Sequence, residues 1–157
     1  MTTSSTKIAL VTGASRGLGR NTAIALARKG VDVIGTYHSN KAEAAGTVAA
    51  IEALGHKAVM FQLDTGTTAG FAAFAVALRQ ALAATWNRTT FDYLVNNAGI
   101  GIGAPFAETT EVDFDRLMNI HLKGVFFLTQ TLLPLIADGA RIVNVSSGLA
   151  HLFQPAA

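Results

Sequence analysis

Three glycines near the N-terminus have the spacing of an anion-binding turn. The apolar residues 8–11 indicate a buried strand, and residues 21–29 have the periodicity of a helix. Glycine permits a close backbone approach between two such elements, and the open N–H groups at a helix start attract phosphate. This strand, turn and helix predict a seat for a pyrophosphate group, although the same glycines could make a tight turn alone. The predicted seat consists of Gly13, Ser15, Arg16, Gly17, Leu18 and Gly19.

The end of the second predicted strand, 31–36, bears on which dinucleotide would bind. An acidic residue at this point accepts hydrogen bonds from the ribose hydroxyls of NAD and repels the extra phosphate of NADP. This sequence has Tyr37 there, followed by His38 and Ser39. Together with Arg16 in the glycine turn, these donors and potential cations favour NADP over NAD as the cofactor. A solvated strand end would have the same composition, and that interpretation stays open.

A carboxylate follows the third predicted strand, 57–63. Asp64 and Thr65 come directly after this strand, at the edge where parallel strands end. A carboxylate at that edge can accept a hydrogen bond from an adenine amino group. Asp64 and Thr65 are therefore candidate cofactor-binding residues, and a turn or a helix cap is the alternative for Asp64.

Two consecutive asparagines end the fourth predicted strand, 91–95. Buried amides need hydrogen-bond partners, so Asn96 and Asn97 are unusual here unless they bond to neighbouring strands. Such ties would let the backbone at Ala98 and Gly99 approach a ligand closely. Asn97, Ala98 and Gly99 are therefore further candidates for cofactor binding.

Two of these segments together resemble the motifs of the short-chain dehydrogenase/reductase family. The motifs are Thr12-Gly13-x-x-x-Gly17-x-Gly19 and, later in the chain, Asn96-Asn97-Ala98-Gly99. The resemblance implies hydride transfer between a nicotinamide cofactor and a small-molecule carbonyl or secondary alcohol. It also implies that Ser147 bonds the substrate oxygen, and that Asn119 kinks a helix and holds a relay water on its backbone carbonyl. Taken alone, Ser147 would belong to a turn and Asn119 would be a partly exposed polar residue.

One part of the family's catalytic machinery has no match in the sequence. In the family, a Tyr four residues before a Lys transfers the proton, a short way beyond the active-site serine. The two tyrosines, Tyr37 and Tyr93, precede Ser147, and no Tyr-x-x-x-Lys follows it. His151 has no partner that would fix it as a substitute acid. We therefore expect the 157-residue chain to be inactive alone, as the first part of a longer reductase.

Two other functions stay open at this level. A non-catalytic dinucleotide-binding sensor or structural protein would also lack the Tyr and Lys pair. A domain for FAD or a nucleotide sugar would share the glycine turn, but the asparagine motif and Ser147 argue against it. Sequence beyond Ala157 would distinguish the enzyme from the sensor.

The remaining periodicity predicts three more helices and a fifth strand. Thr67 or Thr68 is a candidate helix cap, and Thr110 with Asp113 resembles a capping box. We expect the last helix to end at Asp138-Gly139. The predicted elements are helices over 42–54, 71–82 and 114–132, and a strand over 141–145.

These elements alternate as in an α/β fold with a Rossmann-type, doubly wound parallel sheet. Right-handed crossovers give five strands the order 3-2-1-4-5, and the family's C-terminal strands are missing. We expect one incomplete domain over 1–157, with a flexible leader at 1–6. In the family the helix that corresponds to 114–132 helps form a dimer interface, which implies a homodimer or homotetramer.

The composition excludes several other classes of protein. Half of the residues are hydrophobic and 14% are charged, so a substantial core is expected. The formal net charge is +2 without a basic cluster, which argues against nucleic-acid binding. There is no cysteine, and the four histidines are scattered, so we predict neither a disulfide nor a metal site. No apolar run looks long enough for a membrane span, and a cytoplasmic protein is the default.

Overall fold

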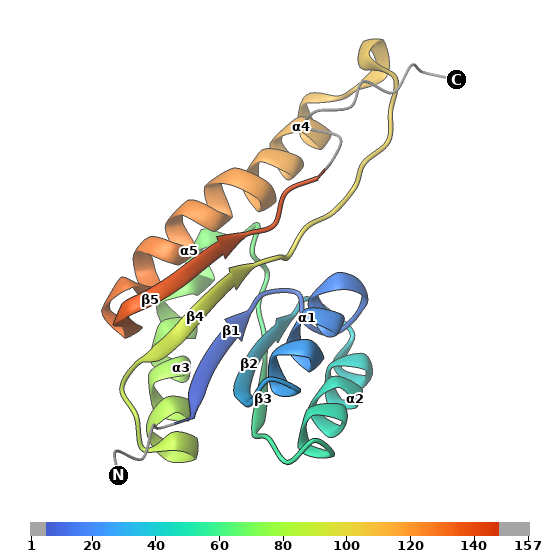
Figure 1. Ribbon diagram of the computed structural model, residues 1–157. Coiled ribbons are helices and arrows are strands. Elements are labelled where there is room, and N and C mark those ends of the chain that lie inside the picture. The colour runs from blue at the N-terminus through green and yellow to red at the C-terminus, as the bar shows by residue number, and fades with distance from the viewer. Residues whose placement is uncertain (1–5, 148–157) are drawn as a thin grey trace.

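The fold is built on one parallel sheet whose strands have the predicted order. The computed structural model describes residues 6–147, and in this range the order is β3-β2-β1-β4-β5 (Figure 1). Every neighbouring pair of strands is parallel. Residues 1–5 of the predicted leader, and His151, lie outside the described residues. The strands are β1 (Lys7–Val11), β2 (Val31–Tyr37), β3 (Ala58–Gln62), β4 (Phe91–Asn96) and β5 (Ile136–Asn144).

Helices pack on both faces of this sheet (Figure 1). Successive side chains of a strand point to opposite faces, so β1 contributes Leu10 to one buried cluster and Val11 to the other. The Val11 cluster lies under the first two helices, and the Leu10 cluster lies against the third and the last. The helices are α1 (Gly17–Ala27), α2 (Lys41–Glu52), α3 (Phe71–Trp86), α4 (Glu111–Met118) and α5 (Gly124–Leu132).

Two helix starts differ from the sequence prediction. α1 begins at Gly17, earlier than the periodicity indicated, because its first turn consists of the glycine motif itself. Neither Thr67 nor Thr68 caps α3: a short 3₁₀ turn, Thr68–Gly70, leads directly into this helix. The capping box at the start of α4 is confirmed, since the Thr110 side chain accepts a hydrogen bond from the Asp113 N–H at 3.1 Å.

The segment after the fourth strand also departs from the prediction. The expected helix 114–132 is interrupted by a wide π turn, Asn119–Lys123, which separates α4 from α5. β5 begins at Ile136, before the expected helix end, because the 3₁₀ turn Leu133–Leu135 with its internal proline stops the helix. The pairing of β4 with β5 then shifts register around Gly139, whose φ is +75°.

One helical stretch is long enough and apolar enough to cross a membrane, whereas the sequence predicted no such stretch. It covers Thr68–Trp86. Phe71, Phe74, Leu78 and Leu82 within it are buried in the Leu10 cluster against the sheet. A core helix passes the same test, and packing against the sheet accounts for these four residues.

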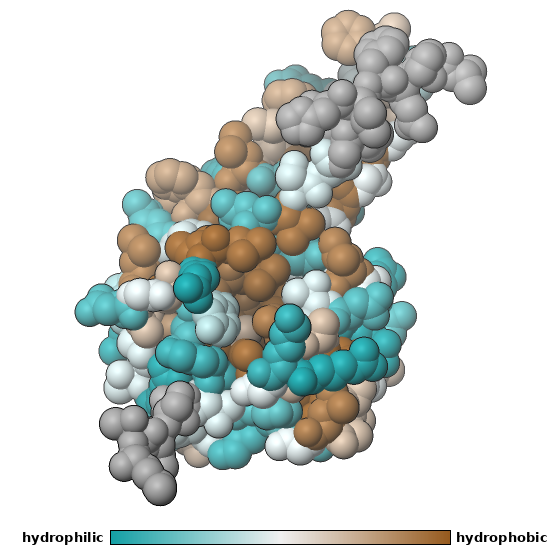
Figure 2. Space-filling view, in the orientation of Figure 1, coloured by the Kyte–Doolittle hydropathy of each residue, from teal (hydrophilic) through white to brown (hydrophobic). Residues whose placement is uncertain are grey.

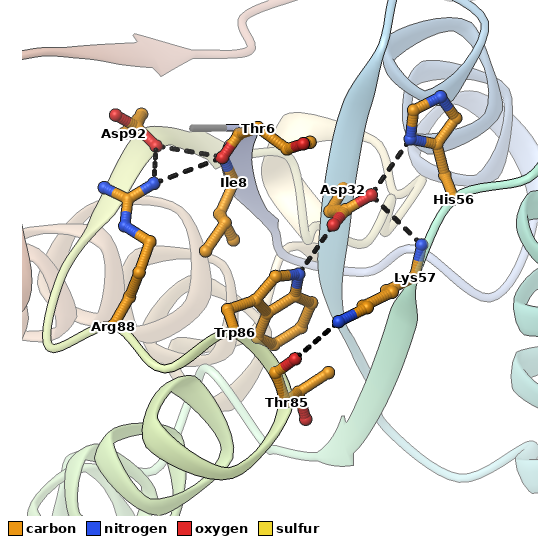
Figure 3. A network of polar contacts seen from close by, with 9 residues as sticks. All are labelled: Thr6, Ile8, Asp32, His56, Lys57, Thr85, Trp86, Arg88 and Asp92. Carbon is orange, nitrogen blue, oxygen red and sulfur yellow. Dashed lines mark hydrogen bonds and ion pairs between the residues drawn. The ribbon is translucent and has the colours of Figure 1, made fainter. Parts of the chain in front are cut away.

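The amino ends of the strands are joined by buried carboxylates, of which Asp92 in β4 is one. Its oxygens accept hydrogen bonds from Lys7 Nζ at 2.8 Å, from Arg88 Nη1 at 2.7 Å and from the Ile8 N–H at 2.9 Å. The Asp92 side chain is 6% exposed, so these partners replace its water. Figure 3 shows Arg88 reaching Asp92 from the segment that precedes β4.

Asp32 in β2 makes the second such cluster (Figure 3). Trp86 Nε1 donates to its Oδ2 at 2.7 Å, and the Lys57 N–H donates to its Oδ1 at 3.0 Å. His56 Nδ1 lies 2.9 Å from the same Oδ1. Asp32 therefore connects β2 with the end of α3 and with the start of β3.

Candidate functional site

The turn between β1 and α1 leaves the N-terminus of α1 open to an anion. No side chain caps this helix, and its first turn contains no acidic residue. The first N–H groups of a helix have no intrahelical acceptor, and the helix dipole favours a negative charge beside them. Gly13 and Gly17 have φ values of +68° and +55°, a region that other residues rarely adopt. The predicted phosphate seat therefore has the required backbone and the required electrostatics.

Gly19 fits this seat for a steric reason. A Cβ atom at Gly19 would overlap the Gly13 carbonyl oxygen and the Asn97 Nδ2 atom. At Gly19, α1 therefore lies so close to the turn and to Asn97 that no side chain fits between them. Such a glycine cradle suits a pyrophosphate, which needs close approach to backbone N–H groups.

A cleft of about 1020 Å³ runs along the carboxyl ends of the strands. Nearly all of the predicted site residues line it, although they come from five separate segments. Gly17 belongs to the turn but does not line the cleft, and Ser147 lies exposed beyond the end of β5, two residues after the lining residue Val145. The predicted residues that line the cleft are Gly13, Ser15, Arg16, Leu18, Gly19, Tyr37, His38, Ser39, Asp64, Thr65, Asn97, Ala98, Gly99 and Asn119.

The end of β2 brings potential cations to one part of the cleft. Arg16, His38 and Ser39 are exposed there, whereas Tyr37 is 8% exposed and its ring belongs to the core. Glu43 also lines this part, and it was not among the predicted site residues. Its signal was its position three residues after Asn40, whose Oδ1 accepts a hydrogen bond from the Glu43 N–H at 3.1 Å.

Asp64 takes the turn role that was its alternative interpretation. Its Oδ1 accepts a hydrogen bond from the Gly66 N–H at 2.9 Å, and its Oδ2 accepts one from Thr67 Oγ1 at 2.8 Å. Partial burial raises the pKa of Asp64, but these hydrogen bonds and the nearby charges of His38 and Arg116 together lower it below its ordinary value. Asp64 therefore stays ionised in the cleft and retains lone pairs for a ligand.

The two asparagines tie strands together as predicted. Asn96 Nδ2 donates to Asn144 Oδ1 at 2.9 Å, which links β4 to β5. Asn97 Nδ2 donates to the Thr12 carbonyl at 2.9 Å, and Thr12 Oγ1 accepts from the N–H groups of Asn97 and Ala98 at 2.9 and 3.0 Å. The loop after β4 is thereby fixed against the glycine turn after β1.

The π turn places two polar residues on the cleft. Asn119 begins the turn, and its carbonyl accepts the wide hydrogen bond from the Gly124 N–H. The helix is therefore irregular at Asn119, and the kink and the relay water expected there stay predictions. His121 also lines the cleft and was missed, because its partner Ile100 lies 21 positions earlier in the chain. Arg116 of α4 was missed for a similar reason, since only the fold brings it near Asp64.

Within residues 6–147, no group of three His, Asp or Glu side chains could hold a metal ion. The polar groups of the cleft therefore have to be interpreted through hydrogen bonds and charge.

Comparison with known proteins places this geometry in a family. The sequence profile of short chain dehydrogenases matches residues 7–156. An uncharacterized oxidoreductase of Methylorubrum extorquens is 37% identical over 149 residues, which cover 95% of this chain and 58% of that protein. The chain therefore spans little more than half the length of this relative.

Two solved ketoreductases share the fold closely. LugOII, a promiscuous reductase that catalyses keto-reduction at C1 during lugdunomycin biosynthesis, has a TM-score of 0.91 and 39% identity, covering 99% of this chain and 64% of its own. LanV, the landomycin C-6 ketoreductase solved with NADP and rabelomycin, has a TM-score of 0.89 and 39% identity, covering 95% and 61%. With the glycine turn, the asparagine motif and the sheet order, these matches mean that the chain belongs to the short-chain dehydrogenase/reductase family.

Proposed function

We propose that the protein carrying this chain is an NADP-dependent oxidoreductase that transfers a hydride between the nicotinamide and a small-molecule carbonyl or secondary alcohol. The observation that carries the proposal is one continuous cleft that joins the open N-terminus of α1, with the exposed Arg16, to the end of β2, with the exposed His38. An open helix start suits the pyrophosphate, and Arg16 with His38 suits the 2′-phosphate. The NADP bound to LanV supports the same choice of cofactor.

The cleft divides naturally between the two halves of a dinucleotide. The ends of β2 and β3, with Ser39, Asp64 and Thr65, would hold the adenosine half. The loop after β4 and the π turn at Asn119 would border the nicotinamide half. Bound NADP would supply the hydride chemistry, and this chain's residues would bind it and orient it.

Ser147 would hydrogen-bond the oxygen atom of the substrate, as the family resemblance implies. A hydroxyl can donate to a carbonyl oxygen whose negative charge increases during reduction. The family resemblance implies that a Tyr beyond the active-site serine donates the proton, and both Tyr37 and Tyr93 precede Ser147.

The cofactor proposal is tested by equilibrium binding of NADP⁺ and NAD⁺. We expect tighter binding of NADP⁺, and a loss of roughly tenfold or more for NADP⁺ but not NAD⁺ in Arg16→Ala, because a charge-assisted contact is removed. Arg28→Ala, at the other end of α1, is the matched control and should change neither affinity. Equal affinities for the two cofactors in the wild type would refute the NADP assignment.

A non-catalytic dinucleotide-binding protein is the second candidate. The same cleft could hold a dinucleotide without any reaction taking place in it. NADPH oxidation by the full-length protein with a panel of ketones separates the two functions. Turnover supports the enzyme, whereas tight binding of NADPH without turnover across the panel supports the sensor.

We also propose that the protein forms a homodimer or homotetramer, as the family resemblance implies. We propose a cytoplasmic location as well. Four large apolar side chains of the α4–α5 segment are between 55% and 75% exposed, namely Val112, Phe114, Leu122 and Phe126. An exposed apolar surface of this kind suits a contact with a second protein chain. Figure 2 shows a further apolar area over β5, where Ile142 and Val143 are exposed. Sedimentation velocity should give an oligomer that Phe126→Asp weakens; a wild-type monomer would refute this proposal.

A further inference from the structure

His121 contacts the loop that follows the asparagine motif. Its Nε2 lies 2.8 Å from the Ile100 carbonyl oxygen and 3.2 Å from the Ile100 N–H nitrogen. One ring nitrogen can donate to the carbonyl in one tautomer or accept from the N–H in the other. The side chain therefore has a backbone partner in either neutral form, and the imidazolium keeps the bond to the carbonyl.

The contact is also sterically close. A Cβ atom at Gly99 would lie 2.6 Å from His121 Cε1, so only glycine leaves room for the ring in this position. A side chain at position 99 would therefore require the His121 ring to move.

The π turn that carries His121 is held on its other side as well. A Cβ atom at Gly124 would overlap the Thr65 carbonyl oxygen, and one at Gly66 would lie 2.9 Å from Ile120 Cγ1. The turn is therefore packed against the loop after β3 while His121 reaches the loop after β4. Such a wide turn inside a helix is often found at functional sites.

We propose that His121 is a positioning residue for the nicotinamide half of the cofactor. It holds Gly99 and Ile100, which line the cleft, in place through the two backbone atoms of Ile100. The inference rests on the proposed function, because it assigns the nicotinamide to this end of the cleft. This role requires no contact between His121 and the adenosine half, since His38 and Ser39 lie at the other end of the cleft.

Two ligands of different length test this assignment in the full chain. NADP⁺ would occupy the whole cleft, whereas adenosine 2′,5′-bisphosphate would occupy the adenosine end alone. We expect His121→Ala and His121→Phe to weaken NADP⁺ by about tenfold, the value of one well-placed hydrogen bond, and to leave the bisphosphate within about twofold. His121→Gln should stay within about threefold of the wild type for both ligands, because an amide can donate and accept. Lys123→Ala, in the same turn, is the control and should change neither affinity.

The outcomes separate the inference from the proposed function. If the wild type binds neither ligand, the proposed function fails. If the wild type binds both and His121→Phe retains full NADP⁺ affinity, or loses affinity for both ligands equally, the positioning role of His121 fails. Thermal unfolding of each variant excludes a general loss of structure.

A double-mutant cycle gives a second, independent test. Gly99→Ala should weaken NADP⁺ binding, because the added methyl displaces the His121 ring. In the His121→Ala background the same methyl has room, so it should cause no further loss. Additive losses would show that Gly99 and His121 act separately, and would overturn the inference.

Discussion

The two ends of the sheet use polar residues in opposite ways. At the amino end, Asp32 and Asp92 are buried, and three groups on the protein hydrogen-bond each carboxylate. At the carboxyl end, the start of α1 has no cap, and Arg16 and His38 are exposed beside the cleft. Polar groups that satisfy one another stabilise the fold, whereas polar groups left open are available to a ligand. The difference distinguishes the buried Asp32 and Asp92, which stabilise the sheet, from the exposed Arg16 and His38, which would bind the cofactor.

The largest expected effect is at the amino end. Asp92→Ala should lower the free energy of unfolding by about 3 kcal/mol, because it leaves Arg88 and the Ile8 N–H without their buried acceptor. Urea unfolding measures this loss. Asp138→Ala, an exposed carboxylate in β5, is the control and should stay within about 0.5 kcal/mol. Equal losses in both variants would contradict the stabilising role of the Asp92 cluster.

At the carboxyl end, Gly19→Ala should weaken cofactor binding as well as stability. The added Cβ would overlap the Gly13 carbonyl oxygen and force the turn to move, at a cost of about 2 kcal/mol in unfolding free energy. The moved turn should also raise the dissociation constant for NADP⁺ by more than tenfold. Calorimetric titration with NADP⁺ checks this, and unchanged affinity would mean that the pyrophosphate lies elsewhere.

The pH dependence of stability should reflect Asp92. Burial raises the pKa of Asp92, but the hydrogen bonds from Arg88, Lys7 and the Ile8 N–H outweigh it and lower the pKa below its ordinary value. The unfolded chain therefore takes up the proton first, and the stabilisation is complete above the ordinary carboxyl pKa of about 4. It is lost as the pH falls through the pKa of the folded protein.

We expect this acid-induced loss to be smaller than the effect of Asp92→Ala, since a protonated carboxyl still accepts hydrogen bonds. Urea unfolding at a series of pH values below 5 measures it. Asp92→Asn should have a flatter pH profile than the wild type. Identical profiles would assign the acid sensitivity to other carboxylates.

Much of the fold could be predicted because its signals are local. The apolar runs before Gly13 and before Asn96 mark buried strands, and right-handed crossovers determine their order. The start of β5 could not be predicted in the same way. The sequence predicts that the last helix continues to Asp138-Gly139, whereas the 3₁₀ turn Leu133–Leu135 ends it earlier. The irregular pairing at Gly139 is a property of two strands together.

The candidate site also contains residues with local signals and residues whose contacts are distant in sequence. Residues directly after a strand, such as His38 and Asp64, were found because parallel strands bring their ends to one edge. His121 and Arg116 reach the cleft from the segment of α4 and the π turn, and their partners lie far away in sequence. No periodicity encodes such contacts, so the fold is needed to find them.

The smallest expected effect compares two helical glycines on the same face of the sheet. Gly46 lies in the middle of α2, exposed, with open space where a Cβ would be. Gly46→Ala should therefore raise the free energy of unfolding by about 0.5–1 kcal/mol, as expected for alanine in a helix, and leave NADP⁺ binding unchanged. Gly19→Ala gains the same helix propensity. An opposite response of the two variants would therefore measure the cost of placing a side chain against the turn after β1. A gain in stability at both positions, with NADP⁺ affinity intact, would mean that the turn after β1 tolerates a side chain and that the carboxyl end is no more specialised than α2.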